Sequence, residues 1–258
     1  MNVLKDIYRY REMVRSLVKR DLQGRYKNSA LGFLWTFLNP LFQLCVYSFL
    51  FTVIIPMPIE KYYIHLFVVL VPWIFFSTCM TAGARVVLDQ QDMVKKIYFP
   101  RTVLPIAFTL SQLVNMLLSM LVILAIVVVS GHGINPLALL ALPGLVLLQF
   151  LVCLAIVLIV SAVTVYLRDM EMILGVVAFA LMYAAPVIYA ESYIPENIRG
   201  LYYCNPMAGI LSGYRSVFYY KELPDVSILI SPILFGTIGV VLGFLAFGRM
   251  QRHFVEQM

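Results

Sequence analysis

The side chains best suited to chemistry are few and scattered along this 258-residue chain. Asp89 and Asp92 are the one pair of acids that could serve a metal- or diphosphate-dependent reaction, while His65, His132 and His253 fall in different segments. Two aspartates three residues apart also fit one solvated helix face. The sequence contains no HExxH, GxSxG or GxxxxGK(S/T) motif. It therefore predicts no catalytic residue, metal site or cofactor in this chain, and any ATP hydrolysis belongs to another subunit.

The four cysteines do not form a recognisable site. Cys45, Cys79 and Cys153 lie in apolar stretches, Cys204 stands apart, and none has a CxxC partner. We expect them to act as packing residues.

Aromatic and amide side chains recur within the apolar stretches. Rings near the end of a membrane span usually belong to the interfacial belt, which accounts for Trp35 and Trp73 taken singly. Amides inside a span tend to face protein or water. Rings that stack on sugars, beside amides that bind hydroxyls, would suit a glycan path. The candidate path residues are Trp35, Asn39, Phe42, Gln43, Tyr47, Tyr183 and Tyr189.

The composition requires that lipid solvate most of the chain. Hydrophobic residues make up 62%, charged residues 12%, and the mean hydropathy is +0.91, whereas a soluble domain carries about 25% charged residues. The fold class predicted is an all-α integral membrane protein with six transmembrane helices. They are expected near 33–55, 62–84, 103–130, 138–167, 172–190 and 227–248.

The distribution of charge predicts the topology and argues against two functions. Of 19 Lys and Arg residues, 15 fall on the side of the two termini and the loops 85–101 and 168–171, so both termini are expected in the cytoplasm. The net charge of +6 therefore indicates membrane orientation rather than nucleic-acid binding. No acid or base lies at the centre of a span, which argues against transport driven by H⁺ or Na⁺.

The stretch 200–214 is uncharged but short for a crossing, and it contains Asn205-Pro206. Runs of this length are more often re-entrant or interfacial. We therefore expect 191–225 to be an external segment that dips back into the membrane.

The charged segments between and before the spans have helical periodicity. Residues 3–26 predict an amphipathic helix that either binds anionic lipid or contacts a cytoplasmic partner, and they resemble no cleavable signal peptide. Loop 85–101 predicts a helix of about four turns stopped by Pro100, either a partner surface or a solvated connector. At Arg168-Asp169 the acid could cap the next helix or take part in docking.

Several motifs occur in the order found in one family. The run KRDLQGRYKNSALGFLWTFLNPL (Lys19–Leu41) is followed by MVKKIYFPRTVLP (Met93–Pro105), YLRDM (Tyr166–Met170), PVIY (Pro186–Tyr189) and CNPM (Cys204–Met207). The chain thereby resembles the membrane subunits of ABC-2 type polysaccharide exporters, which include O-antigen, teichoic-acid and capsule exporters. The resemblance covers essentially the whole chain.

The resemblance implies a permease without enzyme activity, with an interface helix in 1–30 and a six-helix domain in 31–258. It implies a homodimer in the plasma membrane of a bacterium (the inner membrane of a Gram-negative one), surrounded by membrane lipid. Two copies of an ATPase subunit would hold ATP and Mg, and a polyprenyl-diphosphate-linked glycan would be exported. The ATPase-coupling residues implied are Arg20, Asp21, Arg25, Asp92–Tyr98 (with Met93, Lys95 and Lys96), Arg168 and Asp169.

Two other functions stay open at this point. An ABC-2 exporter of drugs or small lipids shares the fold, although it shares less of the opening motif. A polyprenyl-phosphate glycosyltransferase would have to rely on Asp89 and Asp92.

Overall fold

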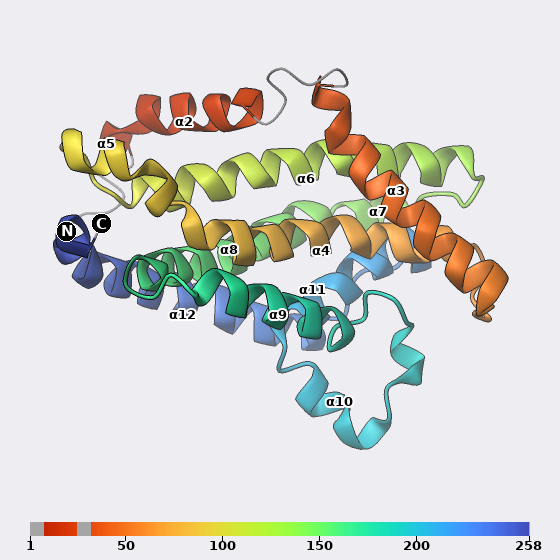
Figure 1. Cartoon of the computed structure of the whole chain (residues 1–258). Helices are drawn as coiled ribbons and strands as arrows, with labels where there is room; N and C mark the ends of the chain where they lie inside the picture. The colour runs from red at the N-terminus through yellow and green to blue at the C-terminus, as the bar shows by residue number, and fades with distance from the viewer. Residues whose placement is uncertain (1–7, 25–31, 258) are drawn as a thin grey trace.

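A computed structural model describes residues 8–24 and 32–257 of the chain, and every regular element in them is helical (Figure 1). Five segments are long and apolar enough to cross a membrane: Trp35–Ile54, Tyr62–Arg85, Val103–Val129, Pro136–Tyr166 and Val226–His253. These confirm five of the six predicted spans to within a few residues, apart from the last, whose helical segment continues five residues past the predicted end.

The elements of these spans are α3 (Trp35–Phe49) with the π-helical η2 (Leu50–Ile54), α4 (Tyr62–Arg85), α6 (Val103–Val129), α7 (Pro136–Leu139), α8 (Leu142–Tyr166), α12 (Val226–Met250) and η6 (Gln251–His253). The other elements are η1 (Gly32–Leu34), α2 (Arg11–Gly24), η3 (Leu88–Gln90), α5 (Gln91–Lys96), α9 (Met170–Tyr183), η4 (Glu191–Tyr193), α10 (Glu196–Tyr202), α11 (Pro206–Arg215), the π-helical η5 (Ser216–Tyr220) and α13 (Phe254–Gln257).

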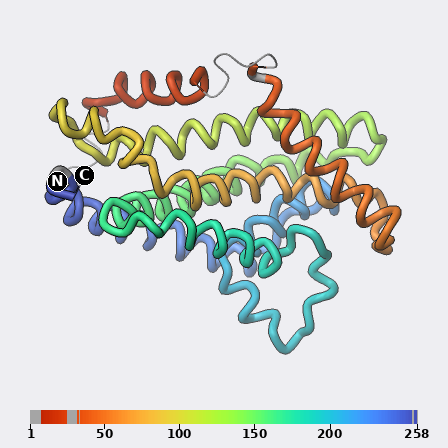
Figure 2. The backbone as a smooth tube through the Cα atoms, in the orientation of Figure 1, coloured from red at the N-terminus to blue at the C-terminus, as the bar shows by residue number. Residues whose placement is uncertain are grey.

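The predicted fifth span, 172–190, is wrong as a single helix. Helix α9 has 14 residues, about 21 Å at 1.5 Å per residue, which is shorter than the roughly 30 Å of a bilayer core. Pro186 explains the break, because its ring would clash with the carbonyl group four residues earlier and it lacks a backbone N–H. Figures 1 and 2 show the chain leaving the bundle after α9, passing through α10 and returning as α11.

Helix α4 is the most buried of the candidate spans. It packs against α3, α6, α8, α9 and α11, so apolar residues surround it on nearly every side. Trp73 lies in this core, 4% exposed. The interfacial-belt interpretation of Trp73 is therefore wrong. Cys79 of α4 and Cys153 of α8 are also buried and are neighbours across this interface, with free thiols.

Glycines allow α12 and α11 to approach their neighbours closely. A Cβ atom added at Gly239 would lie 3.0 Å from the Ala155 Cβ of α8, and one at Gly209 of α11 would lie 2.0 Å from the Ile228 carbonyl oxygen of α12. Small residues at helix contacts are a common means of packing in membranes, where lipid removes the hydrophobic drive for association.

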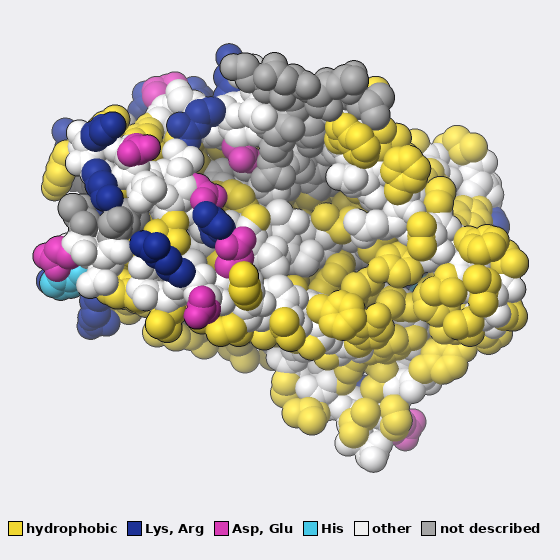
Figure 3. Space-filling view, in the orientation of Figure 1, with side chains coloured by type: hydrophobic (Ala, Val, Ile, Leu, Met, Phe, Trp, Pro, Cys, Tyr) yellow, Lys and Arg dark blue, Asp and Glu magenta, His cyan; other side chains and the backbone are white. Residues whose placement is uncertain are grey.

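Charged side chains gather at the end of the bundle that carries α2 and α5 (Figures 1 and 3). Helix α2 lies along α6, with Val14 and Leu17 packed in a cluster that includes Val94, Phe99 and Val103. This confirms an amphipathic helix over the described part of 3–26. The loop 85–101 is not one helix, because α4 ends at Arg85 and is followed by the short η3 and α5.

Candidate functional site

Two predicted coupling residues attach α2 to the rest of the charged end. The Arg20 guanidinium donates to the Gln90 side-chain oxygen at 2.7 Å, and the Ser111 hydroxyl donates to the Asp21 carboxylate at 2.5 Å. Arg20 thus connects α2 to η3, and Asp21 connects it to α6. Movement of α2 would pull on both. Arg25 lies outside the described residues.

The segment after α5 presents an exposed surface beside these bonds. Val94 and Phe99 are buried, and between them Ile97 is 57% and Tyr98 is 98% exposed. Asp92, Lys95 and Lys96 are exposed as well, and Met93 is half-buried. We call residues 95–101 the α5 tip. Val94 and Phe99 hold this segment in the cluster around Val14, while Ile97 and Tyr98 stay exposed.

A groove of about 850 Å³ is lined in large part by the α5 tip and is strongly basic. The described residues that line it include five cations and no acid. These cations are Arg9, Lys95, Lys96, Arg101 and Arg252. The C-terminal part of the chain joins this region, because the Arg101 guanidinium donates to the Gln251 carbonyl and lies over the Phe254 ring.

The other charged residues of this end have specific partners. Arg85 pairs with Asp89 at 3.2 Å and with Glu171 of α9 at 3.2 Å, a connection between α4 and α9 that the sequence did not suggest. Asp89 is thus neutralised by an arginine. Arg168 and Asp169 are exposed. Asp169 occupies the N-cap position of α9 but its side chain makes no capping hydrogen bond, so the capping prediction is wrong.

The three histidines lie in separate surroundings. His65 is buried in α4 between the Tyr62 and Tyr219 rings, His132 contacts the Tyr219 carbonyl, and His253 pairs with a neighbouring glutamate. In the part of the chain that the structure describes, no three side chains of His, Cys, Asp or Glu come together as a metal-binding group.

The candidate path residues fall into two groups. Trp35 and Asn39 line a pocket of about 400 Å³ between α3, α4 and α6. Further along α3, Phe42 and Gln43 are exposed, and Tyr47 is half-buried against the core. Tyr183, the last residue of α9, is 56% exposed.

Tyr189 extends the second group beyond α9. Its hydroxyl donates to the Tyr183 carbonyl at 2.9 Å and lies 3.3 Å from the Tyr202 hydroxyl.

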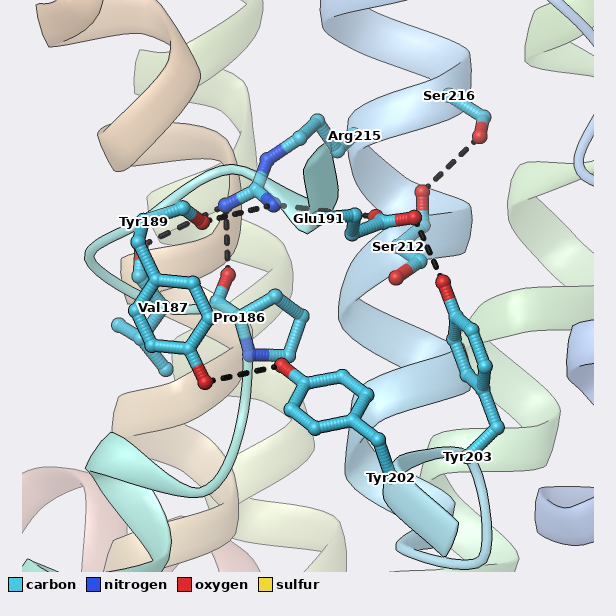
Figure 4. A network of polar contacts seen from close by, with 9 residues as sticks. All are labelled: Pro186, Val187, Tyr189, Glu191, Tyr202, Tyr203, Ser212, Arg215 and Ser216. Atoms are coloured by element: carbon cyan, nitrogen blue, oxygen red, sulfur yellow. Dashed lines mark hydrogen bonds and ion pairs between the residues drawn. The ribbon is translucent and has the colours of Figure 1, made fainter. Parts of the chain in front are cut away.

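Sequence reasoning missed the residue with the most distinctive surroundings. Arg215, at the end of α11, is fully buried (Figure 4). Its guanidinium donates to the Pro186 carbonyl at 2.6 Å and, more weakly, to those of Val187 and Tyr189 at 3.5 Å. The Glu191 carboxylate lies 3.9 Å away. One side chain therefore holds the non-helical backbone that follows α9.

Two further side chains bind the same stretch of backbone. The Asn205 amide donates to the Ala184 carbonyl at 3.3 Å, and the Tyr62 hydroxyl of α4 donates to the Ile188 carbonyl at 2.8 Å. Asn205 also caps α11, since its side-chain oxygen accepts from the Met207 N–H at 3.0 Å. Carbonyls released by the end of a helix need such partners when buried.

A signal for Arg215 existed in the sequence. It directly follows the uncharged stretch 200–214, and a cation at membrane depth costs about 2.5–3.5 kcal/mol or more unless partners satisfy it. Carbonyls released near a proline could have been proposed as those partners. The topology count treated Arg215 only as a charge on the outer side, so its burial was not predicted.

The five long apolar segments and the charged end define a multi-pass membrane protein. The family model of the ABC-2 type transporter matches residues 12–219. The chain belongs to the ABC-2 type transporter family. It is 35% identical over 263 residues to the O-antigen export system permease protein RfbA of Myxococcus xanthus, with all of both chains covered. A protein of the same name from Klebsiella pneumoniae is 28% identical over 240 residues, covering 93% of this chain and 92% of the relative.

Proposed function

We propose that this chain is the membrane-spanning subunit of an ATP-driven exporter that moves a lipid-linked polysaccharide from the cytoplasm to the outer side of a bacterial plasma membrane. The observation that carries the proposal is its similarity to O-antigen export permeases along the whole length of both chains. O-antigen, teichoic-acid and capsule glycans are the substrate classes considered. In a Gram-negative source the membrane is the inner one.

The charged end is assigned to the cytoplasm, together with both termini. The excess of Lys and Arg on that end supports this orientation, because positive loops are retained on the cytoplasmic side. The segment between α9 and α12 then lies at the outer end. Its re-entrant course is supported by the buried α11 and by the backbone that Arg215 holds.

Energy enters at the charged end from a separate ATPase subunit, which holds the ATP and Mg. The exposed Tyr98 supports docking there, as does the basic groove beside it. The Arg20 and Asp21 bonds would pass the movement to η3 and α6. Two copies of this chain and two ATPase subunits form the complete exporter, with the two α3 and α9 flanks beside the path.

Co-purification tests the ATPase assignment. The affinity-tagged chain, expressed with a candidate ABC ATPase subunit from the same genome, should retain that subunit in an equimolar amount. Tyr98→Ala should reduce the retained ATPase at least about tenfold, because a fully exposed aromatic at a docking tip is the kind of residue that dominates an interface. Tyr193→Ala, a half-exposed tyrosine of η4, is the matched control and should retain all of it. Full retention by Tyr98→Ala would contradict this docking site.

A further inference from the structure

The pocket between α3, α4 and α6 has a polar lining although apolar helices form it. It encloses about 400 Å³, within the usual range of ligand pockets, about 300–1,000 Å³. Its polar lining residues are Thr36, Asn39, Thr78, Gln112, Asn115 and Ser119. Polar groups inside a helical membrane bundle need protein, water or ligand partners.

Two of these side chains have unsatisfied atoms. Gln112 is 4% exposed, and its Nε2 has no hydrogen-bond partner among the described residues. The same holds for Oδ1 of Asn115, one turn further along α6. Gln149 of α8 differs, because its Nε2 donates to the Pro72 carbonyl at 2.8 Å. Both residues line the pocket, while the two unsatisfied atoms themselves are buried beneath its surface. A rotation of either side chain would bring an unpaired amide group to a ligand in the pocket.

The chemistry of the lining narrows the ligand class. The described residues around the pocket contribute amides, hydroxyls and the Trp35 indole, and no charged group. Without a cation, a phosphate or diphosphate is a poor fit. Hydroxyl groups on a ring that can stack on an indole fit well, as on a sugar.

A second pocket lies beside this one, toward the charged end. It encloses about 460 Å³ beneath α2, and Thr78 lines both pockets. Arg20, Asp21 and Asp89 stand around this second pocket. Thr78 thus stands between the polar pocket and the charged residues under α2.

We propose that Gln112 and Asn115, with Thr78 and Trp35, form a binding subsite for a neutral sugar residue within each subunit. The subsite rests on the proposed function, since it would hold part of the exported glycan. It adds α6 to a path that the sequence had assigned only to the first and fifth spans. Once turned toward the pocket, the Gln112 amide would donate to a sugar hydroxyl, and the Asn115 oxygen would accept from one.

The two tryptophans of the chain allow a direct test. In the full chain carrying Trp73→Phe, Trp35 is the only tryptophan and its emission reports on the pocket. The probe is an oligosaccharide of one or two repeat units, released from the surface polysaccharide of the source strain. Binding should change the Trp35 emission saturably. Gln112→Leu with Asn115→Leu should raise the Kd about tenfold or more, as the loss of two hydrogen bonds implies.

Two controls separate a binding role from a structural one. Gln149→Leu removes an amide that has a protein partner, so it should lower the Tm and leave the Kd unchanged. The Gln112→Leu and Asn115→Leu variant should not lower the Tm, because neither lost atom has a described partner. Inorganic diphosphate should not compete with the oligosaccharide, and competition would overturn the neutral-sugar assignment.

An unchanged Kd in the double variant, or no Trp35 response to the oligosaccharide, would overturn the subsite and leave a pocket filled by water. ATP-driven export by the unaltered complex is measured in parallel, so that failure of the subsite can be told apart from failure of the proposed function. Export with an unchanged Kd rejects only the subsite, whereas absence of export rejects the proposed function itself.

Discussion

The Arg215 guanidinium lies 2.6 Å from the Pro186 carbonyl oxygen, so a charge at the end of α11 holds the break that follows α9. Proline ends the helix and releases carbonyls, and the planar fork of an arginine can bind several of them at once. The broken helix and the buried charge therefore stabilise each other. Because the connection runs through one side chain, it can be tested by substitution.

Arg215→Gln should destabilise the protein by about 1.5–3 kcal/mol, the usual value of a hydrogen bond to a charged group. The stability of Arg215→Lys should lie between those of Arg215→Gln and the unaltered chain. An ammonium keeps the charge but cannot bind several carbonyls in one plane. Thermal unfolding in detergent measures the difference. Arg199→Gln, on the exposed α10, should behave like the unaltered chain. Equal Tm values for Arg215→Gln and Arg199→Gln would show that the Pro186 contact contributes nothing.

Asn205 has two separable roles. Asn205→Ala should cost about 1 kcal/mol through the lost cap of α11, plus the bond to the Ala184 carbonyl. Asn205→Asp keeps the capping oxygen and loses the donor, so its Tm should lie between those of Asn205→Ala and the unaltered chain. If Asn205→Asp unfolds at the same temperature as Asn205→Ala, the cap has no measurable role.

Gly209→Ala should be severely destabilising. Its Cβ would lie 2.0 Å from a backbone oxygen of α12, which cannot rotate away. Gly175→Ala in α9 is the control, since a Cβ there meets nothing within 4 Å, and alanine favours a helix over glycine by about 1 kcal/mol. Expression and Tm should fall for the first variant and not for the second. Near-normal stability of Gly209→Ala would contradict the close contact between α11 and α12.

The α3–α9 flank makes a prediction for transport. Gln43→Ala and Tyr47→Ala should lower glycan export without lowering the amount of assembled complex. Gln43 is exposed and Tyr47 is half-buried at the edge of the core, so the fold should tolerate the truncation of either. Val46→Ala, an exposed apolar residue of the same helix, should export normally. Unchanged export in both Gln43→Ala and Tyr47→Ala would remove this flank from the path.

Five spans could be predicted from the sequence because their limits are set by local features. Charges and turn residues bound long apolar runs, and the cluster Ser130–Pro136 separates α6 from α8 as expected. Pro186 was a local signal for a helix break as well, but the prediction of the span 172–190 relied on hydropathy alone and overlooked it. An apolar run continues to Ala190, although its helix ends at Tyr183.

The predictions for single residues were wrong where contacts with other helices determine the burial or the partner of a side chain. Trp73 could belong to an interface or to the core, and only the position of α4 among its neighbours decides that it is buried. Asp169 stands at the right position for a cap, yet its side chain takes no part in one. Arg215 is separated by 29 residues from the carbonyl that it binds most closely. No local pattern decides the burial of Trp73 or the missing cap at Asp169, whereas the uncharged stretch before Arg215 could have pointed to a buried charge.

The most direct test of the central claim is ATP-dependent transport in inverted membrane vesicles that contain this chain and its ATPase subunit. The lipid-linked glycan of the source strain should become protected inside the vesicles when ATP is added. Vesicles that contain either subunit alone, or the complex with Tyr98→Ala, should show none of this protection. Protection without ATP, or with this chain alone, would contradict an exporter driven from outside the chain.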